Sequence, residues 1–324
     1  LGGATMDNTT TLHSANWVFV GTYAVVFVAG LTLNLIALVV FFRHKKTRSH
    51  TTTYMTNLAL ADLLLVSTLP IRIYHHSGGS IQNQKMCETV GLILLVNMYG
   101  SIFLLTCISF DRCIAVCFPM SLRIKEHRKK APLICLGVWI LTIGASVPIY
   151  LSKNSTPTDG NITQSNKCFS SRPIYATQPL AITTTLTVGF GIPLFSMLVC
   201  SWCLIRAINK STVAQTDLVN KKKIRRMIAA NLAIFLLCFL PYHAMLFVLF
   251  LKRNTEQIED NLLTVYQYSL MIACLNAMLD PLAYYFTTET FRTRVDVQNL
   301  KKKVWIFYSN SSDGQNRPHS PLNT

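Results

Sequence analysis

The sequence predicts an all-α fold: a bundle of seven membrane-spanning helices with a short amphipathic helix after the seventh. Of its 324 residues, 51% are hydrophobic and only 14% are Asp, Glu, Lys or Arg, about half the charged fraction of an ordinary soluble protein. The apolar residues gather in seven stretches, each close to or above the ~20 residues that a helix needs to cross a bilayer. These stretches are 17–42, 53–76, 86–117, 131–151, 177–207, 225–251 and 262–286.

The distribution of positive charge supports the same topology. The formal net charge is +16, a value typical of nucleic-acid-binding proteins, but those proteins do not carry long apolar runs. Of the 30 Lys and Arg residues, 23 lie at the end of the third stretch, in the connections after the first, third and fifth stretches, or in the C-terminal tail. The positive-inside rule therefore places these segments in the cytoplasm and the N-terminus outside.

The bundle divides the chain into three parts. Residues 1–16 form an extracellular N-terminus, in which residues 1–5 precede Met6 and are interpreted as an added segment. Residues 17–286 form the bundle, and residues 287–324 form a cytoplasmic amphipathic helix and a disordered tail. Glycosylation motifs on the predicted outer side agree with this orientation; they begin at Asn8, Asn154 and Asn161.

Polar residues and prolines inside the spans are the strongest functional signal. An ionisable group in a membrane is energetically costly, so its presence indicates a functional site. Asp62 lies within the second stretch, Asp111-Arg112 near the end of the third and Asp280-Pro281 in the seventh. The other markers are Asn34, Trp139, Pro193 and the run Cys238–Pro241. Together these residues resemble the marker set of rhodopsin-like (class A) G-protein-coupled receptors, and they cover all seven helices.

The resemblance implies a sodium ion in the inactive state as the only cofactor. Its ligands would come from Asp62, Ser101, Asn276 and Asp280. Oxygen ligands suit a hard cation, and buried carboxylates need a cation, a proton or hydrogen bonds. A water-filled polar network without a bound ion is the alternative.

The resemblance also implies a set of switch residues. Arg112 would contact the transducer and be held by Asp111 at rest, although Cys113 replaces the usual tyrosine, so we expect this lock to differ in detail. The remaining switch residues are Ile102, Pro193 and Phe235 as a connector, Phe239 in place of the common tryptophan, the kink-forming Pro241 and Pro281, and Tyr284. In the same family, the cysteines corresponding to Cys87 and Cys168 form a disulfide.

Finer motifs resemble the purinergic-related branch, and most of all its non-Edg lysophosphatidic acid receptors. The motifs are Asn97–Ser109, Asn231–Tyr242 and Asp280–Phe286. Nucleotide receptors of this branch use a cation one turn after the helix-6 histidine and an arginine in helix 7. Here those positions hold apolar residues, including Met245 and Leu270, which disfavours a nucleotide ligand.

A lysophospholipid needs a cationic patch for its head group and an apolar slot for one chain. Arg72, near the outer end of the second stretch, is the main head-group candidate. The other candidates for ligand contact are Tyr99, Lys167, Arg172, His243, Lys252 and Arg253. Two alternatives stay open: Lys252 and Arg253 also fit cations at the membrane interface, and His243 also fits a core histidine with satisfied hydrogen bonds.

The sequence therefore predicts a plasma-membrane receptor, not an enzyme, that binds an anionic lysophospholipid and activates a heterotrimeric G protein. The resemblance adds arrestin and receptor kinases as partners, and no nucleic acid is expected. A receptor for another small anion, such as a carboxylate or a nucleotide derivative, is the first alternative. A transporter or channel is the second, although a retinal pump is excluded because no lysine lies within 262–286.

Overall fold

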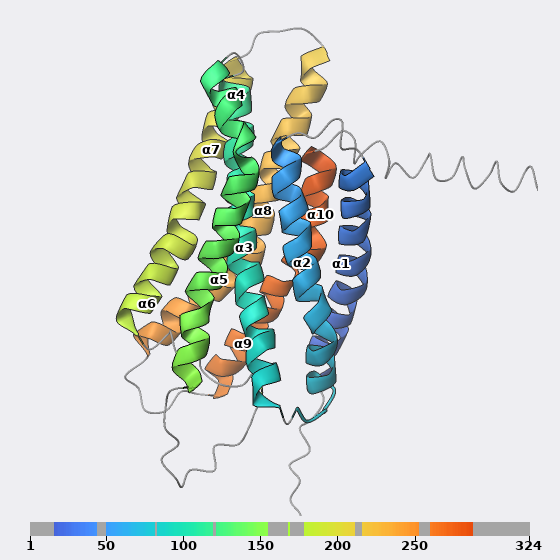
Figure 1. The fold of residues 1–324 in the computed structure, drawn as a ribbon, viewed down its shortest axis with the longest axis vertical. Helices are drawn as coiled ribbons and strands as arrows, with labels where there is room; N and C mark the ends of the chain where they lie inside the picture. Colours follow the sequence, from blue (N-terminus) through green and yellow to red (C-terminus); the bar gives the residue numbers. More distant parts are fainter. Residues whose placement is uncertain are drawn as a thin grey trace, which may run out of the picture.

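The computed structural model describes residues 16–43, 50–81, 83–118, 121–154, 168, 178–210, 216–252 and 260–287, and within these ranges it contains helices and no strand. The long helices run side by side in one bundle (Figure 1). In chain order, the helical elements are α1 (Trp17–Arg43), α2 (His50–His76), α3 (Gln84–Cys117), α4 (Leu122–Lys129), α5 (Ala131–Asn154), α6 (Pro179–Thr184), a π-helical turn (Thr185–Gly191), α7 (Ile192–Lys210), α8 (Thr216–Leu251), α9 (Asp260–Cys274) and α10 (Asn276–Thr287).

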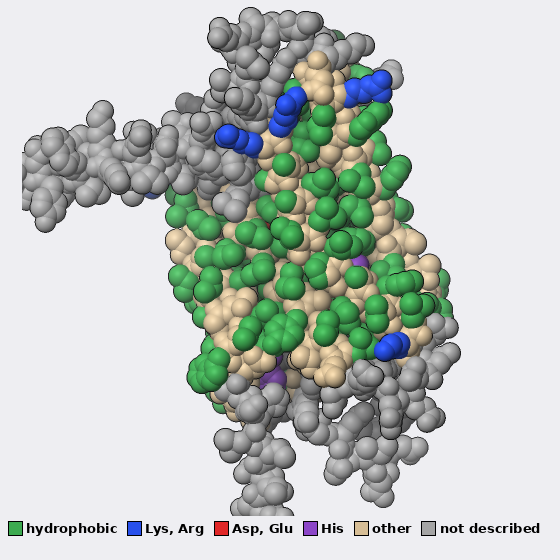
Figure 2. All heavy atoms as spheres, turned by 180° about the vertical axis from the view of Figure 1, so that it is seen from behind, with side chains coloured by type: hydrophobic (Ala, Val, Ile, Leu, Met, Phe, Trp, Pro, Cys, Tyr) green, Lys and Arg blue, Asp and Glu red, His purple; other side chains and the backbone are tan. Residues whose placement is uncertain are grey.

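All seven predicted stretches are helical, and six of the resulting segments are long and apolar enough to cross a membrane. The fourth, α5, has a shorter apolar part at Ala131–Val147. Large hydrophobic side chains face outward along the bundle, among them Val28, Phe195 and Leu237. In the face seen in Figure 2, hydrophobic side chains cover the middle, and Lys and Arg lie toward the two ends. This protein is therefore a multi-pass membrane protein.

Close helix contacts hold α1, α2 and α10 together. A Cβ on Gly30 would approach Val66 Cγ2 to 3.0 Å and the Ala277 carbonyl oxygen to 3.5 Å, so the absence of a side chain allows this approach. Four residues later, Asn34 Nδ2 donates to the same Ala277 carbonyl at 2.7 Å. In a bilayer, small residues and hydrogen bonds between helices carry the packing that the hydrophobic effect supplies in water.

Three features differ from the plain seven-helix expectation. The helix α4 lies between the third and fourth spans, where the sequence predicted only a basic connection. The fifth span contains the π-helical turn before Pro193. The seventh span breaks at Leu275 into α9 and α10, with Leu275 N donating to the Ile272 carbonyl at 3.0 Å. The amphipathic helix predicted after the seventh span lies outside the described residues, which end at Thr287.

Candidate ligand-binding and signalling sites

One end of the bundle carries a disulfide between Cys87, in the first turn of α3, and Cys168. Their Cα atoms are 5.7 Å apart, within the range that a disulfide spans. Asn83 caps α3 by accepting a hydrogen bond from the Met86 backbone N–H at 3.3 Å. The structure confirms the predicted disulfide, and we call this the disulfide end of the bundle.

Arg72 is buried inside the bundle toward the disulfide end, and its residue surface is only 3% exposed. It lies two residues after Pro70 on α2. Its guanidinium donates from Nη2 to the Val90 carbonyl of α3 at 3.4 Å and interacts electrostatically with the Tyr23 side chain of α1. The predicted head-group cation thus sits at the junction of three helices.

Aromatic side chains that the sequence interpretation overlooked lie one turn from Arg72. The His76 ring stacks on Phe19 with ring centroids 4.5 Å apart, and Tyr23 lies 5.7 Å from it. Phe19 also contacts Tyr268 of α9, at 4.7 Å. The sequence contained one signal for them: His75 and His76 lie three and four positions after Arg72, and residues at this spacing share a helix face.

Tyr99 and His243 come together deeper in the bundle, where α3 meets α8. Their rings make an edge contact at 5.9 Å, and Phe190 stacks on His243 at 4.2 Å. His243 Nδ1 bonds the Phe239 carbonyl at 2.7 Å. Its other ring nitrogen, Nε2, is buried and has no hydrogen-bond partner among the described residues. This nitrogen can accept a hydrogen bond from a ligand.

The remaining predicted ligand residues are not brought to Arg72 by the described structure. Lys252 is exposed just after the end of α8. Lys167, Arg172 and Arg253 lie outside the described residues. So do glycosylation candidates Asn8 and Asn161, while Asn154 is the last residue of α5 and its side chain is not described.

A buried polar network connects α2, α3 and α10 in the middle of the bundle. Asn97 Nδ2 donates to Asp62 Oδ1 at 3.1 Å, and Asn276 Nδ2 donates to Ser101 Oγ at 3.0 Å. Asp62 and Asp280 are both 0% exposed, and their carboxyl groups interact with each other. Neither oxygen of Asp280 receives a hydrogen bond from an N–H or O–H of the described residues.

This donor set fits a hard cation such as sodium. Two adjacent buried carboxylates repel each other unless a positive charge compensates them, and the carboxylate, amide and hydroxyl oxygens present are the ligands that hard cations prefer. The structure therefore brings together all four residues predicted for sodium, and it adds Asn97 to them.

The predicted connector residues are packed in the core between this network and His243. Ile102, Phe235 and Phe239 have no exposed surface, and Pro193 is buried. Phe235 stacks on Phe190 at 5.5 Å and meets the edge of Phe239 at 5.7 Å. A continuous row of rings therefore leads from His243 to the middle of α8. Tyr284 belongs to α10, but its side chain is not among those described.

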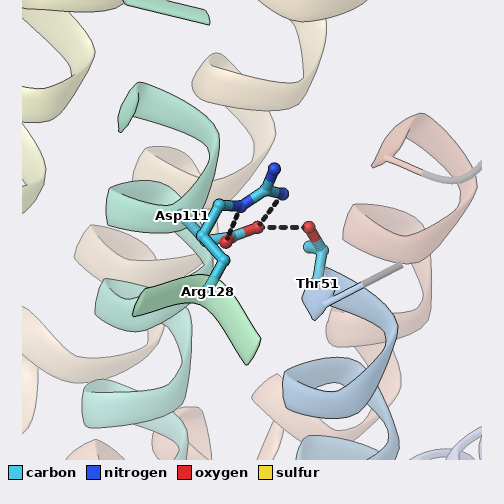
Figure 3. A network of polar contacts seen from close by, with 3 residues as sticks. All are labelled: Thr51, Asp111 and Arg128. Atoms are coloured by element: carbon cyan, nitrogen blue, oxygen red, sulfur yellow. Dashed lines mark hydrogen bonds and ion pairs between the residues drawn. The ribbon is translucent and has the colours of Figure 1, made fainter. Parts of the chain in front are cut away.

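The opposite end of the bundle carries Asp111 and Arg112, and we call it the Arg112 end. Here the Asp111 carboxylate accepts hydrogen bonds from two other helices (Figure 3). Arg128 Nε and Nη2, on α4, bind its two oxygens at 2.7 and 3.0 Å. Thr51 Oγ1, on α2, donates to Oδ2 at 2.5 Å. The carboxylate next to Arg128 holds the pKa of this guanidinium above its ordinary value.

Arg128 is thus a partner of Asp111 that the sequence analysis did not predict. Arg112 interacts with Asp111 electrostatically, but the hydrogen bonds described above come from Arg128 and Thr51. The basic run at residues 123–130 contained Arg128, but its spacing did not indicate which cation reaches the carboxylate.

The family model described as "7 transmembrane receptor (rhodopsin family)" matches residues 33–284. The chain belongs to this family. As a class A G-protein-coupled receptor, it is a receptor and not an enzyme.

The receptor is similar to several named proteins. Lysophosphatidic acid receptor 4 of Mus musculus is 37% identical over 303 residues, which cover 90% of this chain and 80% of that protein. Lysophosphatidic acid receptor 6 of Mus musculus is 35% identical over 286 residues, covering 86% of this chain and 82% of that protein. Probable G-protein coupled receptor 174 of Homo sapiens is 32% identical over 300 residues, covering 90% and 89%.

Proposed function

We propose that this receptor responds to an extracellular lysophospholipid, with lysophosphatidic acid as the first candidate, and activates a heterotrimeric G protein. The observation that carries this proposal is the burial of Arg72 inside the disulfide end of the bundle. A guanidinium buried in a membrane span is costly, and such residues commonly mark a functional site; it also binds phosphate strongly through paired N–H donors. The names of the similar receptors support the same ligand class.

The second ligand contact that we propose is His243. Its Nδ1 bonds the Phe239 carbonyl, which leaves Nε2 to accept a hydrogen bond from a ligand hydroxyl. The stack on Phe190 holds the ring in position. Ligand contact at His243 would then act on the row Phe190, Phe235 and Phe239, and shift the equilibrium between resting and active states.

The disulfide supports an orientation in which that end faces the outside, because disulfides persist in oxidising compartments. The Arg112 end then faces the cytoplasm, where the G protein binds. We propose the plasma membrane as the location, and glycosylation at Asn8, Asn154 and Asn161. Arrestin and receptor kinases would bind the same cytoplasmic side after activation.

We also propose that Asp62 and Asp280 hold a sodium ion in the resting state, together with Ser101, Asn276 and Asn97. The ion would supply the positive charge that two adjacent buried carboxylates require. Residues of this network come from α2, α3 and α10, so a bound ion would hold these helices in the resting arrangement.

The test is G-protein dissociation in cells exposed to lysophospholipids, nucleotides and small carboxylates. We expect a response to 18:1 lysophosphatidic acid that Arg72→Ala abolishes and Arg72→Lys weakens, with surface expression measured for each variant. Lys85→Ala, which removes an exposed cation in the first turn of α3, is the matched control and should retain the response. A response to carboxylates alone would favour the alternative receptor for another small anion, and an unchanged curve for both Arg72 variants would overturn the proposed head-group role.

A further inference from the structure

The Arg112 end also contains four free cysteines on two helices that pack against each other. Cys113 and Cys117 lie in the last turns of α3, and Cys200 and Cys203 lie on α7. The sulfur atoms of Cys113 and Cys117 are 4.0 Å apart, and Cys113 interacts electrostatically with both cysteines of α7. We call these four residues the thiol cluster. Cys113 is thus the member that interacts with thiols on both helices.

The members of the thiol cluster differ in their exposure. Cys113 and Cys200 are buried, and side chains of α8 such as Met227 pack against them. Cys117 and Cys203 are half-buried. Because Cys117 is also the last residue of α3, an oxidant dissolved in water reaches its sulfur before that of Cys113. An accessible thiol beside a second, resolving thiol is the arrangement found in redox-sensing cysteines.

The thiol cluster lies at the opposite end of the bundle from the Cys87–Cys168 disulfide. In the orientation proposed above, it faces the cytoplasm, which keeps thiols reduced, so a disulfide there would be transient and regulatory. The alternative is that these cysteines serve only as small apolar side chains. That alternative predicts that they stay reduced when the receptor meets a mild oxidant.

From this arrangement we infer that the thiol cluster is an oxidation site, at which a hydroperoxide joins α3 to α7 through a disulfide between Cys113 and Cys200. The Cys117 thiolate, after its proton passes to water, attacks one peroxide oxygen. The O–O bond breaks, the second oxygen leaves as water, and Cys117 becomes a sulfenic acid. Cys113 then attacks this sulfur, and the sulfenic hydroxyl leaves as water with the Cys113 proton.

The resulting Cys113–Cys117 bond is an intermediate, because its two residues lie one turn apart on a single helix. Cβ atoms at this spacing are about 5–6 Å apart, whereas a relaxed disulfide holds them at about 3.5–4.5 Å, and strain makes the bond easier to break. Cys200 attacks Cys113 Sγ, and Cys117 leaves and takes up the proton that Cys200 releases. Overall, two thiols lose two electrons and two protons, and hydrogen peroxide becomes two molecules of water.

The disulfide would fix the separation of α3 and α7 where α8 packs over them through Ile224 and Met227. A covalent link formed in one arrangement of helices disfavours every arrangement that requires a different separation. We therefore expect oxidation to oppose the rearrangement of the Arg112 end on activation. This effect on signalling rests on the proposed coupling to a G protein, whereas the oxidation itself does not.

The first test requires neither ligand nor G protein. The purified receptor is treated with hydrogen peroxide, its remaining thiols are alkylated, and disulfide-linked peptides are identified by mass spectrometry. We expect a Cys113–Cys200 link that is lost in Cys113→Ser and in Cys200→Ser, forms more slowly in Cys117→Ser and is retained in Cys203→Ser. Thermal unfolding midpoints measured before oxidation show that each variant is folded.

Cys238 and Cys274 provide a control within the same chain. They interact electrostatically with each other, but both are buried and neither has a half-exposed thiol beside it in the thiol cluster. We expect them to remain thiols under the same treatment. Absence of the Cys113–Cys200 link, or its formation at the same rate without Cys117, would overturn the inference.

The second test measures G-protein activation in membranes treated with hydrogen peroxide before agonist is added. We expect treatment to lower the response of the wild type by about fivefold, the lower range of coupling between sites, and to leave the response of Cys200→Ser unchanged. An equal loss in both receptors would overturn the inferred effect of the link on signalling. If neither activated a G protein before treatment, the proposed coupling would be wrong, and the linked peptides would still decide whether the thiol cluster is oxidised.

Discussion

Arg128 of α4 holds Asp111 of α3 through a two-point ion pair, with Nε 2.7 Å from Oδ1 and Nη2 3.0 Å from Oδ2. Asp111 also accepts from Thr51 of α2, so one carboxylate joins three helices at the Arg112 end. These helices frame the surface on which we propose that the G protein binds. The packing of this end is therefore expected to depend on single hydrogen bonds to Asp111.

Thr51→Val should weaken this junction, because it removes a hydrogen bond to a buried charged acceptor while keeping the side-chain volume. We expect a loss of about 1–2 kcal/mol, seen as a lower thermal unfolding midpoint of the purified receptor. Thr53→Val makes the same chemical change two residues away, where the side chain is half-buried, and should have little effect. Equal midpoints for wild type and Thr51→Val would contradict the prediction.

Trp139→Phe should loosen the contact between α5 and α2. Trp139 Nε1 donates to Asn57 Oδ1 at 3.0 Å, and phenylalanine keeps most of the ring but not the donor. We expect a loss of about 1 kcal/mol, within the range measured for interhelical hydrogen bonds in membranes, read as a fall in the unfolding midpoint. The control is Trp202→Phe, since Trp202 faces outward on α7, and a larger effect there than at position 139 would contradict the prediction.

Replacing sodium by choline in the buffer should lower the unfolding midpoint of the wild type, because an ion that binds the folded state stabilises it by mass action. Asp62→Asn and Asp280→Asn should abolish this sodium dependence by removing one of the two adjacent carboxylates. Glu126→Gln changes an exposed carboxylate on α4 and should leave the dependence intact. A wild-type midpoint that does not respond to sodium would show that the polar network functions without the ion.

Cys87→Ser should reduce surface expression and thermal stability, because the disulfide links positions 81 residues apart in the sequence. Loss of such a link typically costs about 2–4 kcal/mol. The double variant Cys87→Ser with Cys168→Ser should be no worse than either single variant, since both remove the same bond. Cys203→Ser, which changes a free cysteine of α7, serves as the control; additive losses for Cys87 and Cys168 would argue against a shared bond.

Much of the architecture was predictable from local features of the chain. A run of about 20 apolar residues predicts a spanning helix because a helix satisfies its own backbone N–H and C=O groups where no water can do so. The observed helices accordingly begin and end close to the predicted stretches, as α1 at Trp17–Arg43 and α3 at Gln84–Cys117 illustrate. Buried polar residues were predictable for the same reason, and Asp62, Ser101, Asn276 and Asp280 do lie together.

Other features depended on contacts between segments far apart in the chain. The break at Leu275 has no proline or glycine at that position, and it occurs where Asn276 bonds Ser101 on another helix. The ring stack of His76 on Phe19 joins residues of different helices that no local pattern connects.

The sequence by itself determined the series of seven apolar helices, the burial of Asp62, Ser101, Asn276 and Asp280, and the resemblance to a family. Only the tertiary structure decided which groups satisfy those buried charges. Arg128 shows why: it is one of several basic residues between 123 and 130, and all of them fit a cationic connection equally well by spacing. Its choice as partner of Asp111 follows from the packing of α4 against α2 and α3, where a buried carboxylate requires a cation within hydrogen-bonding distance.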